Sequence, residues 1–233
     1  MMRYYFSLLA LFVFSGAFAQ EEVVEKKVVD SLYREDQFYF NASFINVQKS
    51  PGGLRQNKIS PSFGFGIVRD MPINKSRTFS IAAGLGYSIN ILNDNLYTYT
   101  TSDANPTRVY EIISSDIYYS KNKFTTQYLD LPIEIRWRNS TFESHKFWRI
   151  YTGFKLSYLI SDKYTFVNDL GTTILKHDPN LNKLQYGCYI SSGWNSLNVY
   201  MYYGLNPIYK SSEVNGQANK MNLFTLGLQF YIL

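Results

Sequence analysis

The chain has 233 residues, and its charged fraction of 18% is below the roughly 25% of ordinary soluble domains. Its aromatic fraction is also 18%, with 21 Tyr and 17 Phe, which suits a surface that meets lipid. The net charge of +5 is dispersed, so we expect no nucleic-acid partner, and a single cysteine, Cys188, excludes an intramolecular disulfide framework.

The first residues have the pattern of a secretory signal peptide. Arg3 precedes an apolar stretch at 4–18, and the small residues Ala17 and Ala19 form a cleavage site. We therefore expect residues 1–19 to be a signal peptide that is removed on export. An N-terminal membrane anchor is the alternative, but the apolar stretch is short for a spanning helix.

Residues 20–36 form a polar segment with two valine pairs, QEEVVEKKVVDSLYRED. We expect it to be a periplasmic N-terminal segment that precedes the fold. The sequence leaves open whether it is a short helix or a flexible tether.

The stretch TFSIAAGLGYSINI at 78–91 places large apolar residues at every second position, which is typical of a strand with two unlike faces. Similar alternation recurs along the chain, and it predicts an all-β fold at 37–233. We expect an eight-stranded antiparallel up-and-down transmembrane β-barrel. The predicted strands are 37–48, 58–69, 77–92, 126–138, 147–161, 183–194, 197–206 and 221–232.

The connections between these segments alternate in length. Short turns on one side and long loops on the other are typical of an outer-membrane barrel with periplasmic turns and external loops. We therefore expect an outer-membrane location with both chain ends in the periplasm. The short connections are 70–76, 139–146 and 195–196, and the long ones are 49–57, 93–125, 162–182 and 207–220.

Trp137, Trp148 and Trp194 share the parity of the apolar face, and each adjoins a short turn. This pattern predicts an interfacial girdle at the periplasmic boundary of the membrane. The strand glycines have the opposite parity, so we expect them to face a crowded lumen. Pro132 lies within a predicted strand and predicts a bulge or another local irregularity there.

A polar cluster is predicted inside the barrel. If the turn pairs Arg138 with Phe147, Asp130 stands opposite Lys155 and Glu134 lies diagonal to Arg149. Such charges can be buried only when they are paired. A salt-bridged plug is the favoured interpretation, and a narrow path for ions or small solutes is the alternative. The predicted cluster consists of Asp130, Glu134, Arg136, Arg149 and Lys155.

The longest loop, 93–125, is rich in tyrosine and is expected to have little regular structure. Tyrosine offers contact area at low entropic cost, so we expect this loop to bind other envelope proteins, with surface glycans as the second hypothesis. Outer-membrane lipid and lipopolysaccharide are the other expected partners. The candidate contact residues are Tyr97, Tyr99, Tyr110, Tyr118 and Tyr119.

The sequence contains no convincing catalytic or metal-binding motif. His145 falls in a periplasmic turn and His177 in an external loop, so the two histidines cannot meet in one site. We expect no catalytic residues, no metal and no cofactor. The alternative is a hydrolase with a rim site that combines His177 with Asp169 or Asp178.

Six stretches of the chain carry a family likeness: DSLYREDQFYF, RDMPINKSRTFSIAAGLGYS, YLDLPIEIRWR, HKFWRIYTGFKLSYL, YYGLNPIYK and LGLQFYIL. Through them the chain resembles the PorT-like outer-membrane β-barrel proteins of Bacteroidota, a porin-like family. The resemblance implies the fold, the location and at most a connection to type IX secretion. The family has no catalytic residues to transfer.

Overall fold

The computed structural model describes residues 35–139 and 147–232. The predicted signal peptide, most of segment 20–36 and His145 lie outside these residues. No helix in the described part of the chain is long and apolar enough to cross a membrane.

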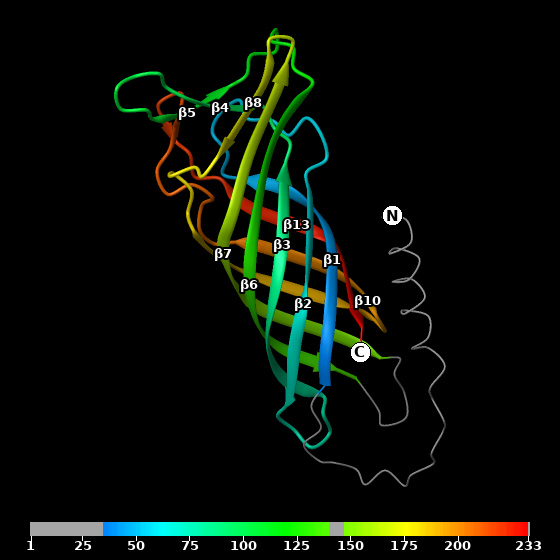
Figure 1. Ribbon diagram of the computed structural model, residues 1–233. Coiled ribbons are helices and arrows are strands. Elements are labelled where there is room, and N and C mark those ends of the chain that lie inside the picture. The colour runs from blue at the N-terminus through cyan, green and yellow to red at the C-terminus, as the bar shows by residue number, and fades with distance from the viewer. Residues whose placement is uncertain (1–34, 140–146, 233) are drawn as a thin grey trace, which may run out of the picture. The chain divides into compact units, whose positions relative to one another are not determined.

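Eight antiparallel strands form a closed ring (Figure 1). Each strand pairs with its neighbour in the chain, and closure comes from pairing of the first strand with the last one. The predicted all-β, eight-stranded up-and-down barrel is therefore confirmed. The ring consists of β1 (Glu35–Gln48), β2 (Pro61–Pro72), β3 (Phe79–Leu92), β6 (Lys121–Arg138), β7 (Trp148–Asn168), β9 (Leu184–Trp194), β10 (Leu197–Gly204) and β13 (Asn222–Ile232).

The outer face of the ring is apolar because outward positions alternate with inward ones along every strand. In β3, for example, Leu85 is 70% exposed whereas Ser80 is 1% exposed. Trp148 and Tyr158 are outward residues near the two ends of this belt on β7, ten residues apart. Ten steps of roughly 3.3 Å at a tilt of about 40° give about 25 Å, the height of the apolar band of outer-membrane barrels.

The inner face combines glycines with large polar aromatic residues. A Cβ on Gly86 would overlap the Tyr39 hydroxyl, and a Cβ on Gly187 would come within 2.7 Å of the Tyr202 ring. An eight-stranded barrel is only wide enough to be filled by side chains. The glycines therefore make room for tyrosines that cross the lumen.

Pro132 interrupts the ladder between β3 and β6. Pairing runs as far as Ala83 with Ile133 and resumes at Gly86 with Asp130 in the same register. Proline has no N–H group to donate to a ladder, which explains the local gap. The predicted irregularity is present, but the register shift lies elsewhere, between Gln127 and Tyr128 in the β6–β7 pair.

The long loops fold together into a cap, and the prediction that loop 93–125 has little regular structure was wrong. The cap contains the four-stranded sheet β12-β11-β5-β4, and β8 extends the upper part of β7. Its core includes Leu96, Ile113, Phe166, Ile208 and Met221, all buried. Apolar side chains of loops that meet water must be shielded from it, and these side chains shield one another. The cap strands are β4 (Leu96–Thr100), β5 (Arg108–Ile112), β8 (Gly171–Lys176), β11 (Glu213–Val214) and β12 (Gln217–Ala218).

Candidate functional site

A network of buried charges occupies the lumen at the short-turn end. Asp70 on β2 links two arginines of β6: its Oδ1 lies 3.5 Å from Arg136 Nη1, and its Oδ2 lies 2.7 Å from Arg138 Nη1. The Ser80 hydroxyl donates a further hydrogen bond to Asp70 Oδ1 at 2.5 Å. The side chains of Asp70 and Arg136 have no solvent exposure, so each charge depends on its partners.

Glu134 extends this network across the lumen. Its carboxylate accepts hydrogen bonds from Arg136 Nε and, at 2.6 Å, from the Tyr189 hydroxyl on β9. Arg136 Nη1 also donates to Gln37 Oε1 on β1 at 3.1 Å. Residues of β1, β2, β6 and β9 are thus joined by hydrogen bonds and ion pairs across the lumen.

Arg149 has a different environment from the other two arginines. Its guanidinium lies over the rings of Phe147, Tyr231 and Tyr151, at 4.7, 5.5 and 5.6 Å from their centroids. Within the described part of the chain it forms no ion pair, and its buried Nε has no hydrogen-bond partner. Cation–π contacts are therefore the interactions that hold this buried charge.

The predicted register between β6 and β7 was wrong by two residues. Arg138 pairs with Arg149 rather than with Phe147, so Asp130 faces Ser157 and Lys155 faces Pro132. A shift of two residues keeps every side chain on its face, and parity alone cannot detect it.

The expected ion pair forms nevertheless, along a diagonal. Lys155 Nζ lies 3.5 Å from Asp130 Oδ2 and 4.6 Å from the Tyr202 ring centroid. The predicted diagonal between Glu134 and Arg149 does not occur, because Glu134 lies opposite Gly153. Of the five predicted lumen residues, the structure thus pairs Asp130 with Lys155 and Glu134 with Arg136.

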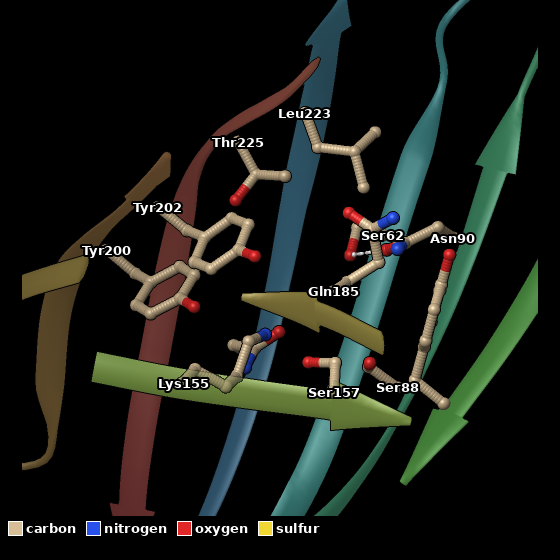
Figure 2. A pocket seen from close by; sticks show the side chains of 12 residues that line it. Ser62, Ser88, Asn90, Lys155, Ser157, Gln185, Tyr200, Tyr202, Leu223 and Thr225 are labelled. Carbon is tan, nitrogen blue, oxygen red and sulfur yellow. Dashed lines mark hydrogen bonds between the residues drawn. The ribbon is translucent and has the colours of Figure 1, made fainter. Parts of the chain in front are cut away.

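A small cavity lies in the lumen beside Lys155 (Figure 2). Side chains from several strands point toward one another around it, and Ser62 donates a hydrogen bond to Asn90 at 2.6 Å. Its volume of about 20 Å³ suits a water molecule rather than a solute. The lining also includes Ser88, Ser157, Gln185, Tyr200, Tyr202, Leu223 and Thr225.

The three tryptophans lie on the outer face near the short-turn end. Trp148 and Trp194 are direct cross-strand partners, with ring centroids 5.8 Å apart in an edge-to-face arrangement. Trp137 lies between Phe79 and Ile150 on the neighbouring strands. The position of these indoles suits the girdle predicted for them.

The five candidate tyrosines of the longest loop have different environments. Tyr118 is 74% exposed, whereas Tyr110 is buried and packs against Tyr209 at 5.1 Å between ring centroids. Tyr97 packs edge-on against Phe166, and Tyr99 donates a hydrogen bond to Glu111. Tyr119 is half-buried and accepts a hydrogen bond from Asn57. Four of the five thus help to build the cap, and Tyr118 is the one that projects from it.

Two buried groups of the cap have altered acidity. Burial raises the pKa of Asp94 from 3.8 to about 6, although a hydrogen bond from the Leu96 amide opposes this effect. Burial and the hydrogen bond to the Asp178 carboxylate also raise the pKa of Tyr110. Because the cap disfavours the ionised form of Asp94, this residue stabilises the cap most at low pH and less as the pH rises through about 6.

Among the described residues, His177 and Asp178 at the rim do not form the hydrogen-bonded pair that the predicted hydrolase site requires. His177 is exposed and forms no hydrogen bond or ion pair there, and both oxygens of Asp178 accept the Tyr110 hydroxyl. Within the same residues no three His, Cys, Asp or Glu side chains are grouped to hold a metal ion. Cys188 is exposed on the apolar outer face.

Sequence reasoning missed two central residues of the charge network, Asp70 and Arg138. Both have inward parity, which was the signal available. Asp70 follows directly after the predicted end of its strand at residue 69, whereas β2 continues to Pro72. Arg138 was the last residue of the predicted strand 126–138, but its partner Asp70 lies on β2, which the predicted cluster did not include.

Comparison with known proteins identifies a family and weak structural similarities. The family model described as "Outer membrane protein beta-barrel domain" matches residues 18–210. A search of curated proteins gives no match. Neisserial surface protein A is 10% identical, with a TM-score of 0.37, over 86% of this chain and 98% of that chain. The attachment invasion locus protein Ail of Yersinia pestis, solved with the heparin analogue sucrose octasulfate, is 10% identical, with a TM-score of 0.34, over 84% and 97%.

Replacement of Asp70 by Asn tests the buried network. We expect Asp70→Asn to lower the free energy of unfolding by about 3–5 kcal/mol, because two buried arginines lose their shared counterion. Urea unfolding in detergent micelles, followed by tryptophan fluorescence, measures this change. The matched control is Asp36→Asn, whose partner Arg69 lies 3.6 Å away in a pair that is more than half exposed. Equal effects of the two substitutions would contradict the assignment.

Proposed function

The chain belongs to the outer membrane protein beta-barrel family, and on this premise we propose that it is a closed, non-enzymatic barrel that serves as a structural or accessory component of an envelope assembly. The family gives the location, the bacterial outer membrane.

The filling of the lumen is the observation that supports this proposal. A path for ions needs continuous water, but the arginine network closes the short-turn end and the Asp130–Lys155 pair lies beyond it. Above the pair, the apolar core of the cap covers the long-loop end. Opening a channel would require separation of buried ion pairs, which is strongly unfavourable.

We place the short-turn end in the periplasm and the cap outside the cell. This orientation follows the general arrangement of outer-membrane barrels, in which the external loops are the longer ones. Both ends of the barrel domain then lie in the periplasm, and the tryptophans lie at the periplasmic boundary. We also propose that the barrel has no enzymatic activity, since among residues 35–139 and 147–232 His177 forms no hydrogen bond or ion pair with a group that could activate a nucleophile.

In this proposal, a surface on the cap binds the partner protein. Ile117 is 51% exposed and Tyr118 is 74% exposed, so two adjacent residues present large side chains at the surface of the cap. Beside them is a cavity of about 400 Å³ lined by Ile112, Ile117 and Tyr119 among polar residues. An apolar side chain of another envelope protein suits this surface. The resemblance to PorT-like proteins supports a narrower form, in which that partner belongs to type IX secretion machinery.

Conductance separates the closed barrel from a channel. We expect the purified protein, inserted into planar lipid bilayers, to give no steady conductance, because buried ion pairs and large side chains of the described strands fill the lumen. A porin in the same bilayers serves as the positive control. Steady, reproducible single-channel currents would contradict the proposal and favour the narrow channel.

Truncation of the exposed pair tests the partner surface. We expect Ile117→Ala/Tyr118→Ala to reduce severalfold the envelope proteins recovered with the barrel after gentle detergent extraction, as measured by quantitative mass spectrometry. The matched control is Leu170→Ala/Ile174→Ala, which truncates two exposed apolar residues at the β7–β8 hairpin. Unchanged recovery, or an equal loss in the control, would contradict a partner site at this position.

A further inference from the structure

Four lysines share the outer face of the barrel where β6, β7 and β8 rise above the apolar belt. Their outward direction follows from strand alternation, because Asn122 and Phe124 between them on β6, and Asp162 and Tyr164 beside them on β7, are buried. We call these residues the lysine cluster. It consists of Lys121, Lys123, Lys163 and Lys176.

The strand register brings these like charges together. Lys163 is the direct cross-strand partner of Lys176, and on its other side it faces Thr125, two residues from Lys123. Like charges directly opposite each other destabilise a sheet. Among the described residues, no carboxylate lies within ion-pair distance of any lysine of the cluster. The cluster therefore lacks a counterion within the described chain.

The height of the cluster above the membrane limits what can neutralise it. Leu129 and Tyr158 are cross-strand partners at the upper edge of the apolar belt. Lys163 pairs with Thr125, four residues beyond Leu129, so it lies about 10 Å above that edge, and Lys121 lies about 20 Å above it, at roughly 3.3 Å per residue and 40° of tilt. A phospholipid headgroup layer is only about 5–8 Å thick. A ligand for the whole cluster must extend further from the membrane.

The cluster lies on three neighbouring strands, β6, β7 and β8, whereas the exposed lysines Lys49, Lys210 and Lys220 line a separate cavity of the cap. On the opposite side of the ring, β1 continues above the exposed Phe44 with the uncharged outward residues Asn46 and Gln48. The direct cross-strand pairing of Lys163 with Lys176 distinguishes the cluster from those other lysines, which no strand pairing in the described residues brings opposite another lysine.

We propose that the lysine cluster binds the phosphorylated and acidic inner sugars of lipopolysaccharide. Such a headgroup carries several negative charges on a rigid sugar scaffold, which has the reach that the height of the cluster requires. Bound phosphate between Lys163 and Lys176 would convert their repulsion into two attractive contacts. The inference rests on the proposed orientation, in which this end of the barrel meets the outer leaflet.

Binding to defined lipids tests the proposal. Purified protein in detergent micelles is titrated with lipopolysaccharide truncated after its inner sugars, and bound lipid is counted by native mass spectrometry. We expect Lys123→Gln/Lys163→Gln/Lys176→Gln to weaken binding at least tenfold. The matched control, Lys49→Gln/Lys210→Gln/Lys220→Gln, removes three exposed lysines that line another cavity of the cap and is expected to change binding less than twofold.

Two further measurements test whether binding depends on the phosphate groups of lipopolysaccharide and whether the variant remains folded. Removal of phosphate from the lipopolysaccharide should weaken binding to the wild type severalfold, and phosphatidylglycerol should bind both variants and the wild type equally weakly. The triple variant of the cluster should unfold in lipid-free micelles at a temperature no lower than the wild type, since it loses only a repulsion.

Equal losses in the two lysine variants, binding independent of phosphate, or equally tight phosphatidylglycerol binding that depends on the cluster would each overturn the proposal. Conductance measured on the same preparations distinguishes a failure of the lysine-cluster proposal from a failure of the closed-barrel proposal. Currents without lipopolysaccharide binding contradict both proposals, whereas silence without binding contradicts only the lysine cluster.

Discussion

Backbone pairing in hydrocarbon is the constraint on which this structure depends. No water is available inside the membrane, so each strand must find its hydrogen-bond partners in neighbouring strands, and the ring must close without a free edge. Closure between β1 and β13 meets this requirement. With eight strands, the enclosed space holds side chains and little else. Apolar residues must then face lipid, and every polar or charged residue of the strands must find its partners within a narrow lumen.

The core of the barrel is therefore polar, and its apolar residues are on the outside. Asp70 between two arginines, Glu134 between Arg136 and Tyr189, and Asp130 beside Lys155 are the contacts that make buried charge tolerable. Glycines of inward parity leave room for the tyrosines of this core. The cap has the opposite arrangement. Its loops meet water, so their apolar residues are buried against one another. In the proposed function, the filled barrel anchors the folded cap.

The alternation of residue types along the sequence predicted which face of the strand each side chain occupies, but it did not predict the register between strands. Leu85, Ile133 and Trp148 face outward as expected, and Asp130 and Lys155 lie inside, because a period of two determines direction. The β6–β7 register differed by two residues, a shift that parity cannot detect. The role of Asp70 and the fold of the cap depend on contacts between segments far apart in the chain. Tyr110, for example, is buried by Tyr209, almost a hundred residues later.

Nitroxide labels on β3 test most directly whether its side chains alternate between lipid and the lumen. Single cysteines at Leu85, Tyr87, Ser88, Ile89 and Asn90, in a Cys188→Ser background in lipid vesicles, carry the labels, and collision with oxygen or a water-soluble nickel complex is measured. The account predicts high oxygen and low nickel accessibility at Leu85, Tyr87 and Ile89, and low accessibility to both at Ser88 and Asn90. Equal accessibility along the strand, or nickel contact at the apolar positions, would contradict a barrel whose outer solvent is lipid.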